Sequence, residues 1–72
     1  MSYTKDFAVT GMTCKHCIMS VEEEVSEVPA VTNVAVDLVS GGTSTVTVTA
    51  DEPIDDQAVA AAIDEAGFSL AN

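Results

Sequence analysis

The side chains with the most reactive chemistry lie in one short segment of the sequence. Met12-Thr13-Cys14-Lys15-His16-Cys17 contains both cysteines of the chain and its only histidine. Two thiols at this spacing can close on one soft metal ion or on each other. A ring this small removes little chain entropy, so a structural disulfide is a poor explanation of the pair.

The residues on either side of this segment favour reactive thiolates. A strand-like run ends at Thr10, Gly11 permits a turn, and a helix-like run extends from Ile18 to Val28. We therefore expect Cys17 in the first turn of a helix, where unpaired backbone N–H groups and the helix dipole lower a thiol's pKa. Thiolates are soft ligands that select Cu(I), with Zn(II) as a further occupant. Two cysteines are too few for a closed structural zinc site, which takes four protein ligands, so low coordination favours Cu(I).

Composition restricts the class of protein and its partners. The 72 residues are enough for one domain, and 47% hydrophobic with 4% aromatic residues predicts an aliphatic core. The net charge of −10 disfavours nucleic acid and anionic membranes as partners. It favours a basic protein partner or a purely solubilising role. No apolar run approaches the roughly 20 residues that cross a bilayer, and no apolar signal segment precedes the first strand. If the chain begins at its native start, we expect a cytoplasmic protein with reduced thiols and no membrane insertion.

Hydrophobic periodicity predicts the order strand, helix, strand, strand, helix, strand. The predicted strands cover 3–10, 31–39, 43–50 and 68–70, and the predicted helices cover 18–28 and 56–66. Gly41-Gly42 marks a hairpin turn, Asp55 is an N-cap, and Gly67 suits the left-handed residue after the second helix. Ile54 and Val59 occupy the positions of a hydrophobic staple. The simplest packing is an α+β fold, a four-stranded antiparallel sheet with both helices on one face.

Alternating and helical spacing also predicts which side chains face the core. The predicted inward residues are Phe7, Val9, Ile18, Val21, Val25, Val28, Val34, Val36, Leu38, Val46, Val48, Val59, Ala62, Ile63 and Ala66.

The chain resembles a known protein family along its whole length, residues 1–72. Gly11 to Cys17 matches the G-M-T-C-x-x-C signature of heavy-metal-associated (HMA) domains. The segment Pro29-Ala30-Val31-Thr32-Asn33-Val34 resembles the family's P-G-V-x-x-V stretch, with Ala30 in a turn where glycine is usual, a replacement that we expect to cost little. The segment Ala62-Ile63-Asp64-Glu65-Ala66-Gly67-Phe68 resembles its A-I-x-x-A-G-Y/F ending. In length and first residue the chain is similar to free-standing bacterial copper chaperones.

The resemblance implies a ferredoxin-like βαββαβ fold and Cu(I) held nearly linearly between Cys14 and Cys17. It implies a carrier rather than an enzyme, which passes copper by thiolate exchange to the metal-binding domain of a copper-transporting P-type ATPase or to a copper-responsive regulator. Thr13 favours copper, because zinc and cadmium relatives often have an acidic residue there. An apo monomer and a copper-bridged dimer are both compatible with the resemblance.

Residues near the cysteines have alternative roles. Met12 is a candidate thioether ligand, but the resemblance implies that its side chain turns inward and anchors the loop. His16 is either a solvent-facing polar residue or a modulator, which favours the thiolates when protonated or joins a copper ion shared by two molecules. Phe68 either shields the ion or packs the last strand. We expect Met19 to pack partly beside the site.

Other functions share parts of this pattern. A thiol–disulfide oxidoreductase of thioredoxin type has the same strand, C-x-x-C and helix, but no Trp precedes Cys14 and no proline falls where a cis-proline is expected. A metal-binding module of a larger heavy-metal transporter would have the same chemistry as a free carrier. A mercury carrier is closely related, although a periplasmic one would need a signal segment.

Overall fold

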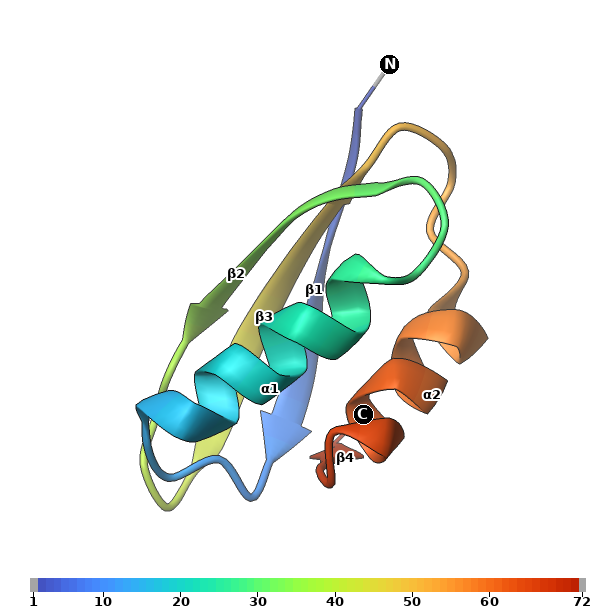
Figure 1. Ribbon diagram of the computed structural model, residues 1–72. Helices are drawn as coiled ribbons and strands as arrows, with labels where there is room; N and C mark the ends of the chain where they lie inside the picture. Colours follow the sequence, from blue (N-terminus) through green and yellow to red (C-terminus); the bar gives the residue numbers. More distant parts are fainter. Residues whose placement is uncertain (1, 72) are drawn as a thin grey trace.

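Alternation of apolar and polar residues gives each long strand one apolar face, and two helices cover that face in the computed structural model (Figure 1). The structure describes residues 2–71. Its elements are β1 Tyr3–Thr10, α1 Lys15–Ser26, β2 Val31–Asp37, β3 Thr43–Ala50, α2 Asp56–Glu65 and β4 Ser69–Leu70. The strands pair antiparallel in the order β2-β3-β1-β4. The predicted ferredoxin-like fold is confirmed.

The core lies between the helices and the central strands β1 and β3. Phe7 on β1 is opposite Val46 on β3, and both point toward the helices. On the other face of the same strands, Asp6 accepts a hydrogen bond of 2.7 Å from the hydroxyl of Thr47. The most deeply buried apolar residues are Phe7, Val9, Met12, Val21, Val25, Val46, Val48, Ala50, Val59, Ala62 and Ile63. Most of these follow the predicted inward pattern, and Met12 adds the loop to the core.

Helix α1 begins earlier than the apolar pattern predicted. Its first residue is Lys15 rather than Ile18, and Cys14 is the N-cap. The carbonyl of Cys14 accepts hydrogen bonds from the N–H groups of Cys17 at 3.1 Å and Ile18 at 3.4 Å. The prediction was wrong because the first turn consists of exposed polar residues such as His16, which have no apolar periodicity.

The turn after α1 contains a strained residue. The helix ends at Ser26, two residues before the predicted Val28, and Ala30 then adopts φ +74°. A left-handed conformation costs a residue with a Cβ about 1–2 kcal/mol relative to the usual regions. The prediction that Ala30 replaces glycine at little cost is therefore wrong.

Strand β2 differs from a regular strand at one position. A bulge lies between Val31 and Asn33, so that Val31 is opposite Ala50 while Asn33 is opposite Thr49. Val31 and Val34 are three positions apart, and in a regular strand this spacing would place them on opposite faces. The extra residue of the bulge lets both pack against the core. The strand also stops at Asp37 instead of the predicted position 39.

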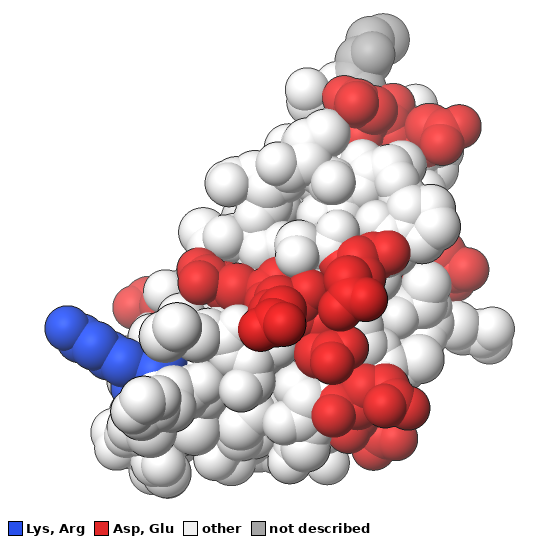
Figure 2. Space-filling model, in the orientation of Figure 1, with Lys and Arg blue, Asp and Glu red and all other residues white. Residues whose placement is uncertain are grey.

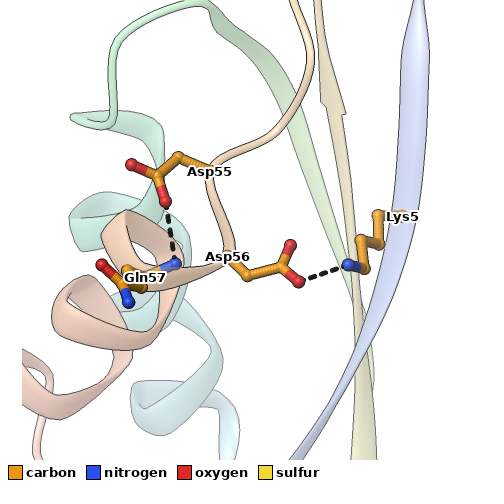
Figure 3. A network of polar contacts seen from close by, with 4 residues as sticks. All are labelled: Lys5, Asp55, Asp56 and Gln57. Atoms are coloured by element: carbon orange, nitrogen blue, oxygen red, sulfur yellow. Dashed lines mark hydrogen bonds and ion pairs between the residues drawn. The ribbon is translucent and has the colours of Figure 1, made fainter.

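Helix α2 has the caps that the sequence predicts. The carboxylate of Asp55 accepts a hydrogen bond of 3.0 Å from the N–H of Gln57 (Figure 3). At the other end Gly67 has φ +94°, and the N–H of Phe68 donates to the carbonyl of Ile63 at 3.1 Å. This is the Schellman arrangement that favours glycine after a helix.

A single ion pair joins α2 to the sheet among the described residues. The ammonium of Lys5 on β1 contacts a carboxylate oxygen of Asp56 in the first turn of α2 (Figure 3). The same ammonium lies 5.6 Å from the ring centroid of Phe7. None of the helices in residues 2–71 has the length and apolar character needed to cross a membrane.

Candidate metal centre

Both cysteines lie at the end of the molecule where β1 leads into α1 (Figure 1). Cys14 is exposed and Cys17 is half-buried, and their sulfur atoms are 3.8 Å apart. Both thiols are free. Since a thiolate–metal bond is about 2.3 Å long, two sulfurs at this distance can reach one ion between them. The structure thus brings together the pair that the sequence singled out.

The local backbone makes Cys17 more acidic than an ordinary cysteine thiol. Backbone hydrogen bonds from Thr13, and then from Cys14, lower the pKa of Cys17 from 9.0 to about 7. Partial burial opposes this shift, while the side chains of Cys14 and Thr13 add to it. The hydroxyl of Thr13 is 3.9 Å from the Cys17 sulfur. At neutral pH a large fraction of Cys17 is therefore thiolate, the form that binds metal.

The loop before Cys14 is held by the core on one side. Met12 has no exposed surface and packs in the hydrophobic core, so its thioether is not presented to solvent. Gly11 has φ +92°, which suits glycine. A Cβ at Gly11 would lie 3.5 Å from the ring of Phe68, which shows that this ring lies beside the loop backbone. Phe68 is half-buried against the core, so it packs and borders the loop at once.

The hairpin between β2 and β3 holds the other side of the loop, a contact that the sequence analysis missed. The hydroxyl of Ser40 donates to the carbonyl of Thr13 at 3.3 Å. The hairpin is braced by Ser44, which is fully buried; its hydroxyl accepts from the N–H of Val39 at 2.9 Å and donates to the carbonyl of Val39 at 3.4 Å. The one indication in the sequence was that Ser44 lies two positions before Val46, on the side of the strand that was predicted to face the core.

Two residues near the cysteines point to solvent. His16 is exposed in the first turn of α1, and its role as a modulator stays a prediction. Met19 is 62% exposed, so the prediction that it packs beside the site is wrong. It lines a groove between α1 and β2 together with residues such as Glu22 and Val34. Within residues 2–71, no three or more His, Cys, Asp and Glu side chains are placed to hold one metal ion.

The family of the chain follows from a comparison with known proteins. A model of the heavy-metal-associated domain matches residues 6–69, a span that contains both cysteines and both helices. The chain belongs to the heavy-metal-associated domain family. The COP-associated protein of Helicobacter felis is 37% identical to this HMA domain over 65 residues, which cover 90% of the present chain and 94% of the relative.

Solved structures agree with this assignment. A CopZ metallochaperone is 28% identical, with a TM-score of 0.82 and coverage of 94% of this chain and 98% of that one. The N-terminal soluble domains of Bacillus subtilis CopA are 29% identical, with a TM-score of 0.70. There the match covers 97% of this HMA domain and 48% of the CopA chain.

The charge of this HMA domain is distributed unevenly over its surface. Figure 2 shows acidic side chains over the face that the helices form, and basic atoms only at one edge of that view. The acidic residues of α1 are Glu22, Glu23 and Glu24, with Glu27 at its C-cap. Any macromolecule that approaches this face meets a negative potential.

Proposed function

We propose that this HMA domain is a cytoplasmic copper carrier that binds one Cu(I) ion between Cys14 and Cys17. The main support is the pair of sulfur atoms 3.8 Å apart at an exposed end of the molecule. Soft thiolates select Cu(I) over harder ions. The similarity to a CopZ metallochaperone supports the role of a metal carrier.

The positions of the two cysteines fit a two-coordinate ion. With bonds of about 2.3 Å, a linear arrangement would place the sulfurs about 4.6 Å apart, so they must separate slightly on binding. Cys14 lies outside the helix with an extended backbone, whereas Cys17 is within the first turn. Cys14 can therefore move while Cys17 stays in place.

Transfer follows from the same arrangement. A thiolate of the partner adds to the bound ion, and only then does one resident sulfur, the exposed Cys14, release it. The second resident sulfur is replaced by a further partner thiolate in the same way. Each step forms one metal–sulfur bond and breaks one, without a change in the oxidation state of copper. No acid–base catalysis is needed, and we propose a carrier rather than an enzyme.

The partner that we propose is the metal-binding domain of a copper-transporting P-type ATPase, with a copper-responsive regulator as the alternative. The similarity to the soluble domains of CopA supports a partner of the same fold. The net charge of −10 favours a partner whose docking face is basic.

A competition titration tests the metal site. Reduced protein is titrated with Cu(I) against a chelator of known strength, and the titration is repeated with Zn(II). We expect one tightly bound Cu(I) per monomer and no comparable retention of Zn(II). Cys14→Ser and Cys17→Ser should each lose the ion, and the matched surface variant Ser20→Ala should keep it. Undiminished Cu(I) affinity in both cysteine variants would refute the proposal.

Thiol–disulfide exchange is the second candidate, because the pKa of Cys17 is lowered to about 7 next to a second free thiol. Reduction of insulin with dithiothreitol separates the two functions. A carrier leaves the rate of insulin reduction unchanged, whereas an oxidoreductase accelerates it.

A further inference from the structure

A second cavity lies at the other end of the molecule from the cysteines. The turn between α1 and β2 and the loop between β3 and α2 form its walls (Figure 1). Its volume is about 260 Å³. An apolar cavity of about 150 Å³ can hold a molecule the size of benzene, so this one has room for a branched aliphatic side chain. The lining residues are Val28, Pro29, Ala30, Val31, Ala50, Glu52, Pro53, Ile54, Asp55 and Ala58.

The lining is mostly apolar, and the cavity has its shape before any ligand binds. Val28, Val31 and Ile54 form the floor, since they pack against the hydrophobic core. The alanines in the walls are too short to fill the space, and Pro29 and Pro53 fix the backbone of the two turns. Preformed apolar hollows with a few polar groups are typical of binding sites.

The wall contains Ala30, the one non-glycine residue with a positive φ among residues 2–71. Ala30 has φ +74°, a conformation that glycine adopts without penalty. Glycine would relieve the strain but would remove a methyl group from the wall. Strained backbone of this kind is concentrated at functional sites. The strain agrees with a role for the Ala30 methyl group in contact with a ligand.

The charge around the cavity is negative. Glu52 and Asp55 are its ionisable lining residues, and Asp51 and Asp56 are adjacent in the sequence. Figure 2 shows acidic atoms at this end of the molecule. The ammonium of Lys5 compensates the charge of Asp56. The carboxylates of Asp51, Glu52 and Asp55 therefore remain to attract a cationic ligand.

We infer that this cavity is a docking site for a short segment of a partner protein that presents an aliphatic side chain flanked by Lys or Arg. The aliphatic group enters the hollow, and the cations face Glu52 and Asp55. The site is remote from Cys14 and Cys17, so a partner held here leaves the cysteines accessible. The inference does not depend on which metal the cysteines bind.

The test uses a synthetic peptide, acetyl-KRLKK-amide, added to the ¹⁵N-labelled full chain and followed by amide chemical shifts. We expect saturable shifts confined to residues 28–31 and 50–58. A peptide with serine in place of leucine should bind about tenfold or more weakly, because the buried apolar group is lost.

Three variants locate the site. Glu52→Gln should raise the Kd about threefold, and Glu23→Gln, the same charge change on α1, should leave it unchanged. Ala30→Gly should raise the Kd about threefold through the lost methyl group. Urea denaturation of Ala30→Gly, which we expect to be more stable than the parent chain, separates weaker binding from unfolding.

Other results would overturn the inference. They are the absence of saturable shifts at millimolar peptide, shifts centred on α1 or the cysteine loop, or equal effects of Glu52→Gln and Glu23→Gln. Shifts at residues 28–31 and 50–58 that appear on concentrating the protein alone would identify a second copy of the chain as the occupant instead.

Discussion

Cys17 shows how strongly the backbone around a residue can change its chemistry. The hydrogen bonds that stabilise its thiolate come from Thr13 and Cys14, which precede it in the loop and at the N-cap. These groups act only when the loop and the first turn of α1 are formed. The low pKa of Cys17 is therefore a property of the folded protein, and unfolding should abolish it.

The pH dependence of Cys17 can be measured in Cys14→Ser, which leaves one thiol. The folded pKa of about 7 lies below the ordinary 9.0, so between these values the unfolded chain holds a proton that the native state has released. Stability from this group is thus present above the ordinary pKa and is lost as the pH falls through the folded pKa. We expect the alkylation rate of Cys17 by iodoacetamide to rise with a midpoint near 7 in native protein and near 9 in urea. A native midpoint near 9 would contradict this.

Ala30 offers a stabilising substitution. Relief of about 1–2 kcal/mol of left-handed strain exceeds the roughly 0.5–1 kcal/mol of extra chain entropy that glycine loses on folding. We expect Ala30→Gly to raise the free energy of unfolding by about 0.5–1 kcal/mol, measured by urea denaturation. The control Ala61→Gly, on the exposed side of α2, should lower it by about 1 kcal/mol. A loss of stability in Ala30→Gly would show that the turn is not strained.

At the scale of elements, the cysteine loop is held between two supports. Met12 ties it to the core, and the β2–β3 hairpin contacts it through the hydrogen bond from Ser40 to Thr13. The hairpin is closed by Ser44, whose buried hydroxyl pairs with both polar groups of the Val39 backbone. The position of the loop thus depends on a residue distant from it in the sequence.

Ser44→Ala tests this support. Removal of the hydroxyl leaves the partly buried N–H of Val39 without its partner, which costs about 1–3 kcal/mol, while the carbonyl of Val39 keeps the hydrogen bond of 3.1 Å from the N–H of Gly42. We expect a loss of this size in thermal or urea unfolding, together with faster amide exchange in the loop at residues 11–14. Ser40→Ala, which removes an exposed hydroxyl, should change stability by less than about 0.5 kcal/mol but should also speed exchange in the loop. Exchange in the loop that is unaffected by both variants would mean that the hairpin does not position it.

At the scale of the whole molecule, the charge is the dominant feature. Twelve acidic and two basic residues give −10, and the ammonium of Lys5 is paired with Asp56. Repulsion among the remaining carboxylates opposes the compact state, and a basic docking face on a partner would relieve it.

Salt should therefore stabilise the protein. Raising the ionic strength from about 0.01 M to about 1 M shortens the screening distance from about 30 Å to about 3 Å. We expect the free energy of unfolding to rise on the order of 1 kcal/mol, with a smaller rise in the double variant Glu23→Gln, Glu24→Gln. A fall in stability with salt would show that attractions such as Lys5–Asp56 outweigh the repulsion.

Much of the fold was predictable because most of the signals are local. The alternation around Phe7, the N-cap Asp55 and the C′ glycine Gly67 act over a few residues, and each agrees with the structure. The predictions failed where local pattern is weak. The first turn of α1 has no apolar stripe, and the bulge after Val31 depends on pairing with β3.

The sequence by itself determined the order of the elements, the aliphatic core, the acidic surface and the presence of two thiols at a strand-to-helix junction. Spacing and residue type are sufficient for these, because backbone propensity and burial act on neighbouring residues. Only the tertiary structure decided the 3.8 Å between the sulfurs and the contact from Ser40 to Thr13. It also decided the cavity beside Ala30. These features join groups whose distance depends on how the chain packs. The periodicity of a sequence does not specify that distance.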